Sequence, residues 1–180
     1  MKEFAVISVI FIISLYFGYL WAEENPNNAK NVVEELFENL SFIKNLPKFI
    51  IFILIFLNNS VKSLLSMLFG VAFGIVPILF ILFNGYLIGV VVSVASKDVG
   101  IWNVLLMLVP HGILEIPAII IACSYGLKIG IASFKKVMGG DISISNEIKN
   151  SLEVFAKIVL PILLIAAFIE TYITPLISQI

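Results

Sequence analysis

Arginine is absent from this chain of 180 residues, cysteine and histidine each occur once, and charged residues make up only 13% of the sequence. All eleven basic residues are therefore lysines. Without arginine, voltage sensing by an arginine-rich helix and bidentate capture of phosphate are excluded. Cys123 has no second cysteine with which to pair, so an intramolecular disulfide and a cysteine-built metal site are excluded too.

The shortage of charge accompanies an excess of apolar residues, which form 61% of the chain and give a mean hydropathy of +1.11. Soluble globular domains carry about 25% charged residues. The composition therefore indicates an integral membrane protein whose surroundings are the lipid bilayer. A formal net charge of −1 and the lack of a polybasic run give no reason to expect a nucleic-acid partner.

Five apolar segments are long enough to cross a bilayer, which takes about 20 helical residues. We expect one membrane domain, 1–180, of the all-α class: a bundle of about five transmembrane helices. The first helix is expected at 4–21, and four more within 46–177, at about 46–69, 72–95, 101–134 and 154–177. A break at Asn58-Asn59 is one possibility, and the fourth helix is expected to be broken or kinked around Pro110 and Pro117.

A polar segment, 22–45, separates the first two spans. Its apolar residues recur at helical spacing and predict an amphipathic helix that lies across the ends of the others. Those residues are Val33, Leu36, Phe37, Leu40 and Ile43.

Lysine positions predict the orientation, because cytoplasmic loops carry an excess of basic residues. With the N-terminus cytoplasmic and the C-terminus outside, six lysines fall inside and four outside. The inner lysines are Lys2, Lys128, Lys135, Lys136, Lys149 and Lys157, and the outer ones are Lys30, Lys44, Lys48 and Lys97. We therefore expect a multi-pass protein of the cell membrane with a cytoplasmic N-terminus.

Polar residues at membrane depth define a candidate intramembrane site. His111 and Glu115 are four residues apart and share one helical face within an apolar stretch. Ionisable groups at this depth are costly, so we expect both to face the bundle interior, near Glu170 and at least one asparagine. The asparagines at a similar depth are Asn58, Asn59 and Asn84. The alternative is a purely structural network of interhelical hydrogen bonds.

Small residues predict where helices approach closely. Gly85 and Gly89 form a small-xxx-small pair, and Val92 is expected on the outward face of the same helix. A second packing seam, continuing roughly along the Glu115 face, consists of Ala118, Ala122 and Gly126.

The order of these residues resembles the stage II sporulation protein M family, which comprises multi-pass membrane proteins of bacteria and archaea. The resemblance covers about 57–175, and its most specific part is PHGILEIPA at 110–118, where Ile116 stands in place of an expected leucine. It also includes Asn58-Asn59, Gly70, Gly74, Asn84-Gly85, Gly89, Gly126, Glu170 and Thr174-Pro175. In spore formers the resemblance implies a role in engulfment, holding peptidoglycan hydrolases at the septal membrane. Family members also occur in organisms that make no spores.

Three function classes remain. The first is a membrane scaffold or assembly factor whose partners are other membrane proteins or further copies of the chain. The second is a channel or transporter for a small ion or solute that uses the polar cluster. The third is an intramembrane metal-dependent hydrolase with His111, Glu115 and Glu170 as ligands. The third is least favoured, because His-x3-Glu is not the two-histidine helical zinc motif; we predict no catalytic residue and no cofactor.

Overall fold

The computed structural model describes residues 2–39 and 46–174; the side chains of residues 39, 105 and 107–111 are also outside its description. Within residues 2–39 and 46–174 every regular element is a helix and none is a strand, which confirms the all-α class. Five of its helices are long and apolar enough to cross a membrane, as the sequence predicted.

The elements follow one another with short connections. They are α1 (Lys2–Glu24), α2 (Pro26–Asn39), α3 (Lys48–Leu68), η2 (Phe69–Val71), α4 (Ile75–Val99), α5 (Ile101–Val137), α6 (Ile144–Val154), η3 (Phe155–Val159), α7 (Leu160–Phe168) and η4 (Ile169–Ile173). Together, α6 to η4 form the fifth membrane-spanning element, Ile144–Ile173.

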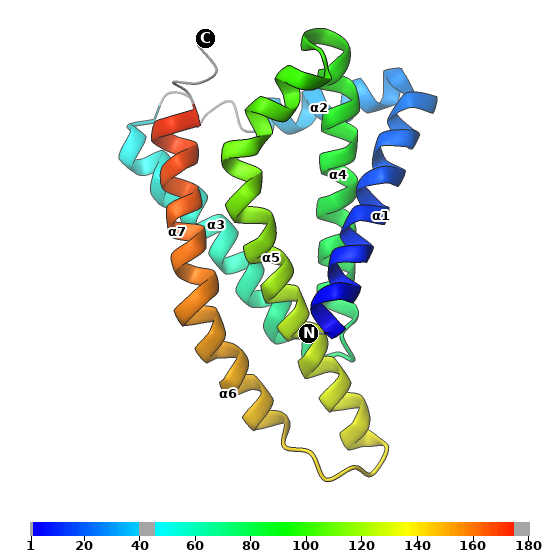
Figure 1. Cartoon of the computed structure of the whole chain (residues 1–180), viewed down its shortest axis with the longest axis vertical. Coiled ribbons are helices and arrows are strands. Elements are labelled where there is room, and N and C mark those ends of the chain that lie inside the picture. The colour runs from blue at the N-terminus through cyan, green and yellow to red at the C-terminus, as the bar shows by residue number, and fades with distance from the viewer. Residues whose placement is uncertain (1, 40–45, 175–180) are drawn as a thin grey trace.

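Helix α5 is the centre of the bundle. It packs against α1 and α4 on one side and against α3 and α7 on the other (Figure 1). The most apolar stretch of α5 is 61% buried, compared with 17–33% in the other four spans. At 37 residues, α5 is about 55 Å long and exceeds the roughly 30 Å hydrocarbon core, so one of its ends extends beyond the start of α1.

Two predicted interruptions do not break a helix. Helix α3 continues unbroken through Asn58 and Asn59, and α5 is a single helix through Pro110 and Pro117 that changes direction in its first part (Figure 1). A proline removes one backbone donor and displaces one carbonyl, and the neighbouring packing tolerates this as a bend.

The fifth span begins earlier than the sequence predicted, at Ile144 and not near Val154. Ser143 caps it, because its hydroxyl accepts a hydrogen bond from the Asn146 backbone N–H at 3.3 Å. The π-helical segment η3 lies just before Pro161. Its wider turns accommodate a residue that lacks an N–H, so the chain stays helical from α6 into α7.

Helix α2 lies across one end of the bundle, where Ala29 and Val33 pack against Ala22 and Val90. Of the apolar residues of α2 predicted to face the bundle, Leu36 and Phe37 are exposed, and Leu40 and Ile43 lie outside the described residues. The outward placement of Val92 is wrong, since it is only 8% exposed. Helix α4 is covered by α1, α5 and α2 together, which leaves less of its circumference free.

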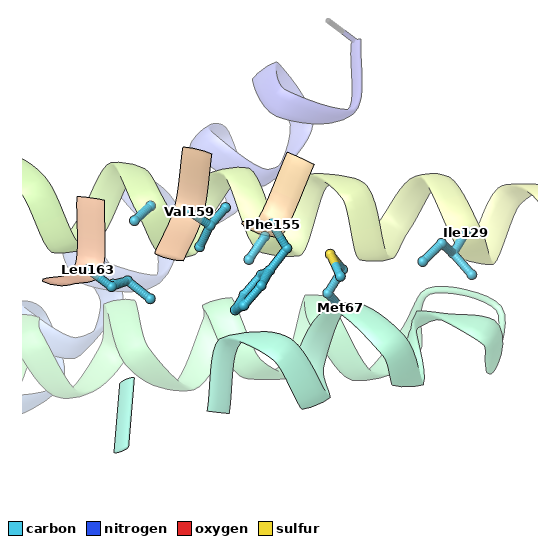
Figure 2. Close-up of a cluster of buried hydrophobic side chains, with 7 residues drawn as sticks. Met67, Ile129, Phe155, Val159 and Leu163 are labelled. Carbon is cyan, nitrogen blue, oxygen red and sulfur yellow. The ribbon is translucent and has the colours of Figure 1, made fainter. Parts of the chain in front are cut away.

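Apolar side chains from three elements close the other half of the bundle. Met67 of α3 and Ile129 of α5 lie in one cluster with Phe155, Val159 and Leu163 of the fifth span (Figure 2). The helix–helix contacts there are made by apolar side chains, which attract one another by dispersion in a bilayer.

In the opposite half of the bundle, glycines allow the backbones of α1 and α4 to approach each other closely. A Cβ placed on Gly18 would lie 2.0 Å from the Tyr86 carbonyl oxygen, and one on Gly89 would lie 2.1 Å from that of Leu15. One on Gly85 would lie 2.1 Å from the Ser14 Oγ. The two backbones therefore meet where no other residue type fits.

Candidate functional site

Glu115 and Asn84 are brought together in the middle of the bundle. Both line a small cavity of about 30 Å³, whose other walls are the apolar residues Phe11, Ile81, Ile88, Ile116 and Ile119. Glu115 is 9% exposed, and the Asn84 side-chain amide donates to the Phe80 carbonyl oxygen at 2.7 Å. A cavity of this size holds one or two water molecules, and among its described lining residues Glu115 and Asn84 are the polar ones.

The other two ionisable residues of the predicted cluster lie on α5 and η4. His111 is one helical turn before Glu115 on α5, but its side chain is outside the described residues. Glu170 is half-buried in the π-helical segment η4, which packs against α5 and α3. Next to it, Thr171 donates to the Ala167 carbonyl oxygen at 2.8 Å. Such π-helical turns often occur at functional positions.

The asparagine pair of α3 lies apart from this cavity. Asn58 is exposed, Asn59 is half-buried, and the Asn58 amide donates to the Asn59 side-chain oxygen at 3.2 Å. Lys62, one turn further along α3, is exposed on the same face as Asn58. Neither Asn58 nor Asn59 lines the cavity beside Glu115. The outer face of α3 is therefore a second polar feature of the spans.

The depth of Asn58 makes this outer face expensive in a bilayer. Asn58 is midway between Lys48 and Leu68, the ends of α3, and so about 15 Å from each. That distance places it near the centre of a hydrocarbon core about 30 Å thick. A lysine at the helix centre costs about 2.5–3.5 kcal/mol on insertion scales, a cost that Lys62 reduces by extending toward the nearer end of the span.

The predicted packing residues lie at interfaces. Ala118 and Ala122 of α5 are fully buried in the cluster around Met67 and Leu163. Gly126 continues the same face: a Cβ there would lie 3.0 Å from the Met67 Cα, and the Gly126 carbonyl oxygen lies 2.1 Å from a Cβ placed on Gly70. The seam therefore carries the close approach of α3 and η2 to α5.

A groove at the start of α1, lined by four polar and four apolar residues, was not anticipated from the sequence. It has a volume of about 370 Å³ and lies between α1, α5 and the fifth span; its polar lining is Glu3, Ser124, Tyr125 and Lys128. The Lys128 ammonium is 3.1 Å from the Glu147 carboxylate and 5.9 Å from the centroid of the Tyr125 ring. The signal that could have found it is Lys128 itself, a charge inside an apolar segment.

A set of polar contacts at the opposite end of the bundle was also not predicted from the sequence. The Ser93 hydroxyl donates to the Glu23 carboxylate at 2.7 Å, and the Lys97 ammonium is 3.1 Å from the same oxygen. These contacts join the end of α1 to the end of α4. Because both charged side chains are more than 40% exposed, the ion pair contributes at most about 1 kcal/mol.

Metal binding was tested against the side chains that the structure describes. Among them, no three His, Cys, Asp or Glu side chains come close enough together to hold a metal ion. His111, the proposed third ligand beside Glu115 and Glu170, is outside that set.

These observations define a multi-pass helical membrane protein with a tightly packed interior and polar groups in separate places. The chain belongs to the stage II sporulation protein M family, whose model matches residues 7–175. This result confirms the resemblance seen in the sequence.

The curated relatives come from one archaeon and cover nearly the whole chain. Uncharacterized protein MJ0793 of Methanocaldococcus jannaschii is 27% identical over 174 residues, which are 94% of this chain and 92% of that protein. Uncharacterized protein MJ0706 of the same organism is 28% identical over 194 residues, covering 99% of this chain and 84% of that protein. No solved structure matches the chain.

Proposed function

We propose that the protein is a scaffold or assembly factor of the cell membrane, with its N-terminus in the cytoplasm. The observation that carries this proposal is the small size of the cavity beside Glu115 and Asn84. At about 30 Å³ it has room for one or two waters, and five of its seven lining residues are apolar. An ion or solute path needs a continuous hydrated space lined by polar groups.

The close packing on both sides of α5 supports the same proposal. Glycine contacts join α1 to α4, and an apolar cluster joins α3 and α5 to the fifth span, so the helices on both sides of α5 are held together by direct packing. Two exposed polar side chains of α3, Asn58 and Lys62, point away from that interior. Membership of the stage II sporulation protein M family agrees with it, because the role that the resemblance implies is to hold other proteins at a membrane.

A reconstitution experiment tests the proposal. The wild-type chain and the Glu115→Gln variant are placed in liposomes, and proton, potassium and sodium flux are measured with entrapped dyes. We expect no flux above protein-free liposomes for either protein. Glu115→Gln keeps the shape and hydrogen-bonding capacity of the side chain but cannot ionise. A wild-type flux that Glu115→Gln abolishes would overturn the proposal in favour of a channel or transporter.

The same variant gives a second measurement in native membranes. A scaffold that works through its outer surface keeps its partners when Glu115 is neutralised. We therefore expect tagged wild-type and Glu115→Gln proteins, cross-linked and purified in parallel, to carry the same set of membrane proteins. Loss of that set in Glu115→Gln would contradict a role located on the surface.

A further inference from the structure

The exposed face of α3 has the pattern of a helix-pairing seam. Leu54, Asn58, Val61 and Leu65 are separated by steps of four, three and four residues, which is the spacing of the core positions of a coiled coil. The three apolar members are 38%, 49% and 44% exposed, and Asn58 is exposed between them. In Figure 1, α3 runs behind α5 and α7. This seam is the outer stripe of α3, distinct from the side packed on α5.

Asn58 indicates what covers the seam. A lone apolar stripe is satisfied by lipid, but an amide at the centre of the bilayer finds no hydrogen-bond partner there. Within residues 2–39 and 46–174, the Asn58 side chain hydrogen-bonds only to the neighbouring Asn59 side chain, at 3.2 Å. An amide carries two donors and two acceptor lone pairs, so it retains capacity for a second molecule.

Symmetry then selects the occupant. Two copies inserted with the same orientation are related by a two-fold axis along the membrane normal, so their α3 helices run parallel and each residue meets its own equivalent. At the midplane Asn58 meets Asn58, and an amide is complementary to itself because it both donates and accepts. A single asparagine at a core position favours a parallel, in-register dimer.

We propose that the outer stripe of α3 is a dimerisation surface whose partner is a second copy of this chain. The two α3 helices pack in parallel through Leu54, Asn58, Val61 and Leu65, and the two Asn58 amides hydrogen-bond across the axis. Lys62 flanks the seam, and its ammonium extends toward the nearer membrane boundary. The inference rests on the proposed function only in taking this face as a binding surface.

Disulfide cross-linking in native membranes tests the geometry. Single cysteines replace Leu54, Asn58 and Val61 on a Cys123→Ser background, and Phe83→Cys is the matched control. Phe83 of α4 is 63% exposed, so its side chain faces lipid. It directly precedes Asn84 and therefore lies at a depth similar to that of Asn58. We expect dimeric bands on oxidation at all three seam positions and none at residue 83. Because a cysteine at residue 58 removes the amide itself, residues 54 and 61 decide the test. Cross-linking at residues 54 and 61 no stronger than at residue 83 overturns the proposal.

A dilution experiment in liposomes tests the role of the amide without an introduced cysteine. Labelled copies are diluted into increasing lipid, and energy transfer gives the dimer dissociation constant. We expect Asn58→Leu to raise that constant by about tenfold, the effect of one interhelical polar contact, and Asn58→Gln to stay near wild type. An unchanged constant in Asn58→Leu, or a chain that is monomeric throughout, refutes the inference.

These outcomes are separable from a failure of the proposed function. Cross-linking and dilution report self-association whether or not the protein conducts ions, and the flux assay reports conduction whether or not the protein dimerises. If residue 58 cross-links only to a different membrane protein, the second copy is the wrong occupant even though the scaffold role stands.

Discussion

Replacing Gly89 with alanine is the sharpest test of the contact between α1 and α4. The new Cβ would lie 2.1 Å from the Leu15 carbonyl oxygen and 2.8 Å from the Tyr19 backbone nitrogen. Both atoms belong to backbone, so no side-chain rotation relieves the contact. Ordinary van der Waals contact begins at 3.4 Å, and α1 must therefore move away from α4 by more than an ångström.

The magnitude follows from two opposing effects. Overpacking of a close-packed interface costs about 1–3 kcal/mol. Alanine in place of glycine within a helix recovers about 0.5–1 kcal/mol of backbone entropy. From the middle of each range, the net loss is about 1.3 kcal/mol. Since 1 kcal/mol shifts the Tm of a protein of this size by about 2–4 °C, we expect Gly89→Ala to lower the Tm by about 3–5 °C.

Thermal unfolding of the detergent-solubilised protein measures this effect, with Gly112→Ala as the matched control. Among the side chains that the structure describes, a Cβ on Gly112 comes no closer than 3.4 Å, to the Ile116 Cδ1. Only the entropy effect remains, and we expect the Tm of Gly112→Ala to rise by about 1–4 °C. The two variants should thus shift in opposite directions. If Gly89→Ala is neutral or stabilising, the backbone contact between Gly89 and Leu15 is not as close as the structure has it.

A double variant checks that the glycines share one crossing. A Cβ on Gly18 would lie 2.0 Å from the Tyr86 carbonyl oxygen, at the same pair of helices. Once Gly89→Ala has moved α1 away from α4, a Cβ at residue 18 also has more room beside the Tyr86 carbonyl oxygen. Gly18→Ala then needs a smaller further movement of the two helices. The combined loss of unfolding free energy should therefore be smaller than the sum of the two single losses.

Two further predictions concern accessibility. On a Cys123→Ser background, single cysteines are placed at Asn28 on α2 and at Asp141 after α5, two exposed positions. They should react with an impermeant thiol reagent from opposite sides of the membrane, and labelling of both from one side would contradict five spans. In the wild-type protein Cys123 is fully buried, with its sulfur 3.6 Å from the Ser66 hydroxyl. Maleimide should therefore label Cys123 on the order of a hundredfold more slowly than it labels Asn28→Cys. Equal labelling rates would show that the bundle opens at α5.

Much of the fold could be predicted because a bilayer constrains it strongly. The hydrocarbon thickness fixes how many apolar residues a span needs, and five segments met that length. The boundary of the fifth span was missed for a local reason. Residues 144–153 are polar, and their helix depends on the Ser143 cap and on continuity through η3, neither of which hydropathy detects.

The candidate site could be predicted only in part, because depth does not determine rotation. Sequence position placed Glu115, Asn84 and Asn58 at similar heights in the bundle. Whether each side chain points inward depends on how its helix is turned, which the packing of neighbouring helices sets. Glu115 and Asn84 line the same inner cavity, while Asn58 is turned outward with Lys62. Glu3, Lys128 and Glu147 come from distant segments and meet only in the folded chain.

This division of the polar residues has a consequence for function. Inside the bundle, Glu115 and Asn84 share a cavity too small for more than one or two waters, and its other described walls are apolar. Outside it, Asn58 faces the centre of the bilayer, where an amide is costly unless a second protein supplies a partner. A chain that closes its interior and leaves its polar group on the lipid-facing surface is suited to binding within the membrane. The surface of α3 is therefore where substitutions should alter function first, and the Glu115 cavity is where they should alter stability.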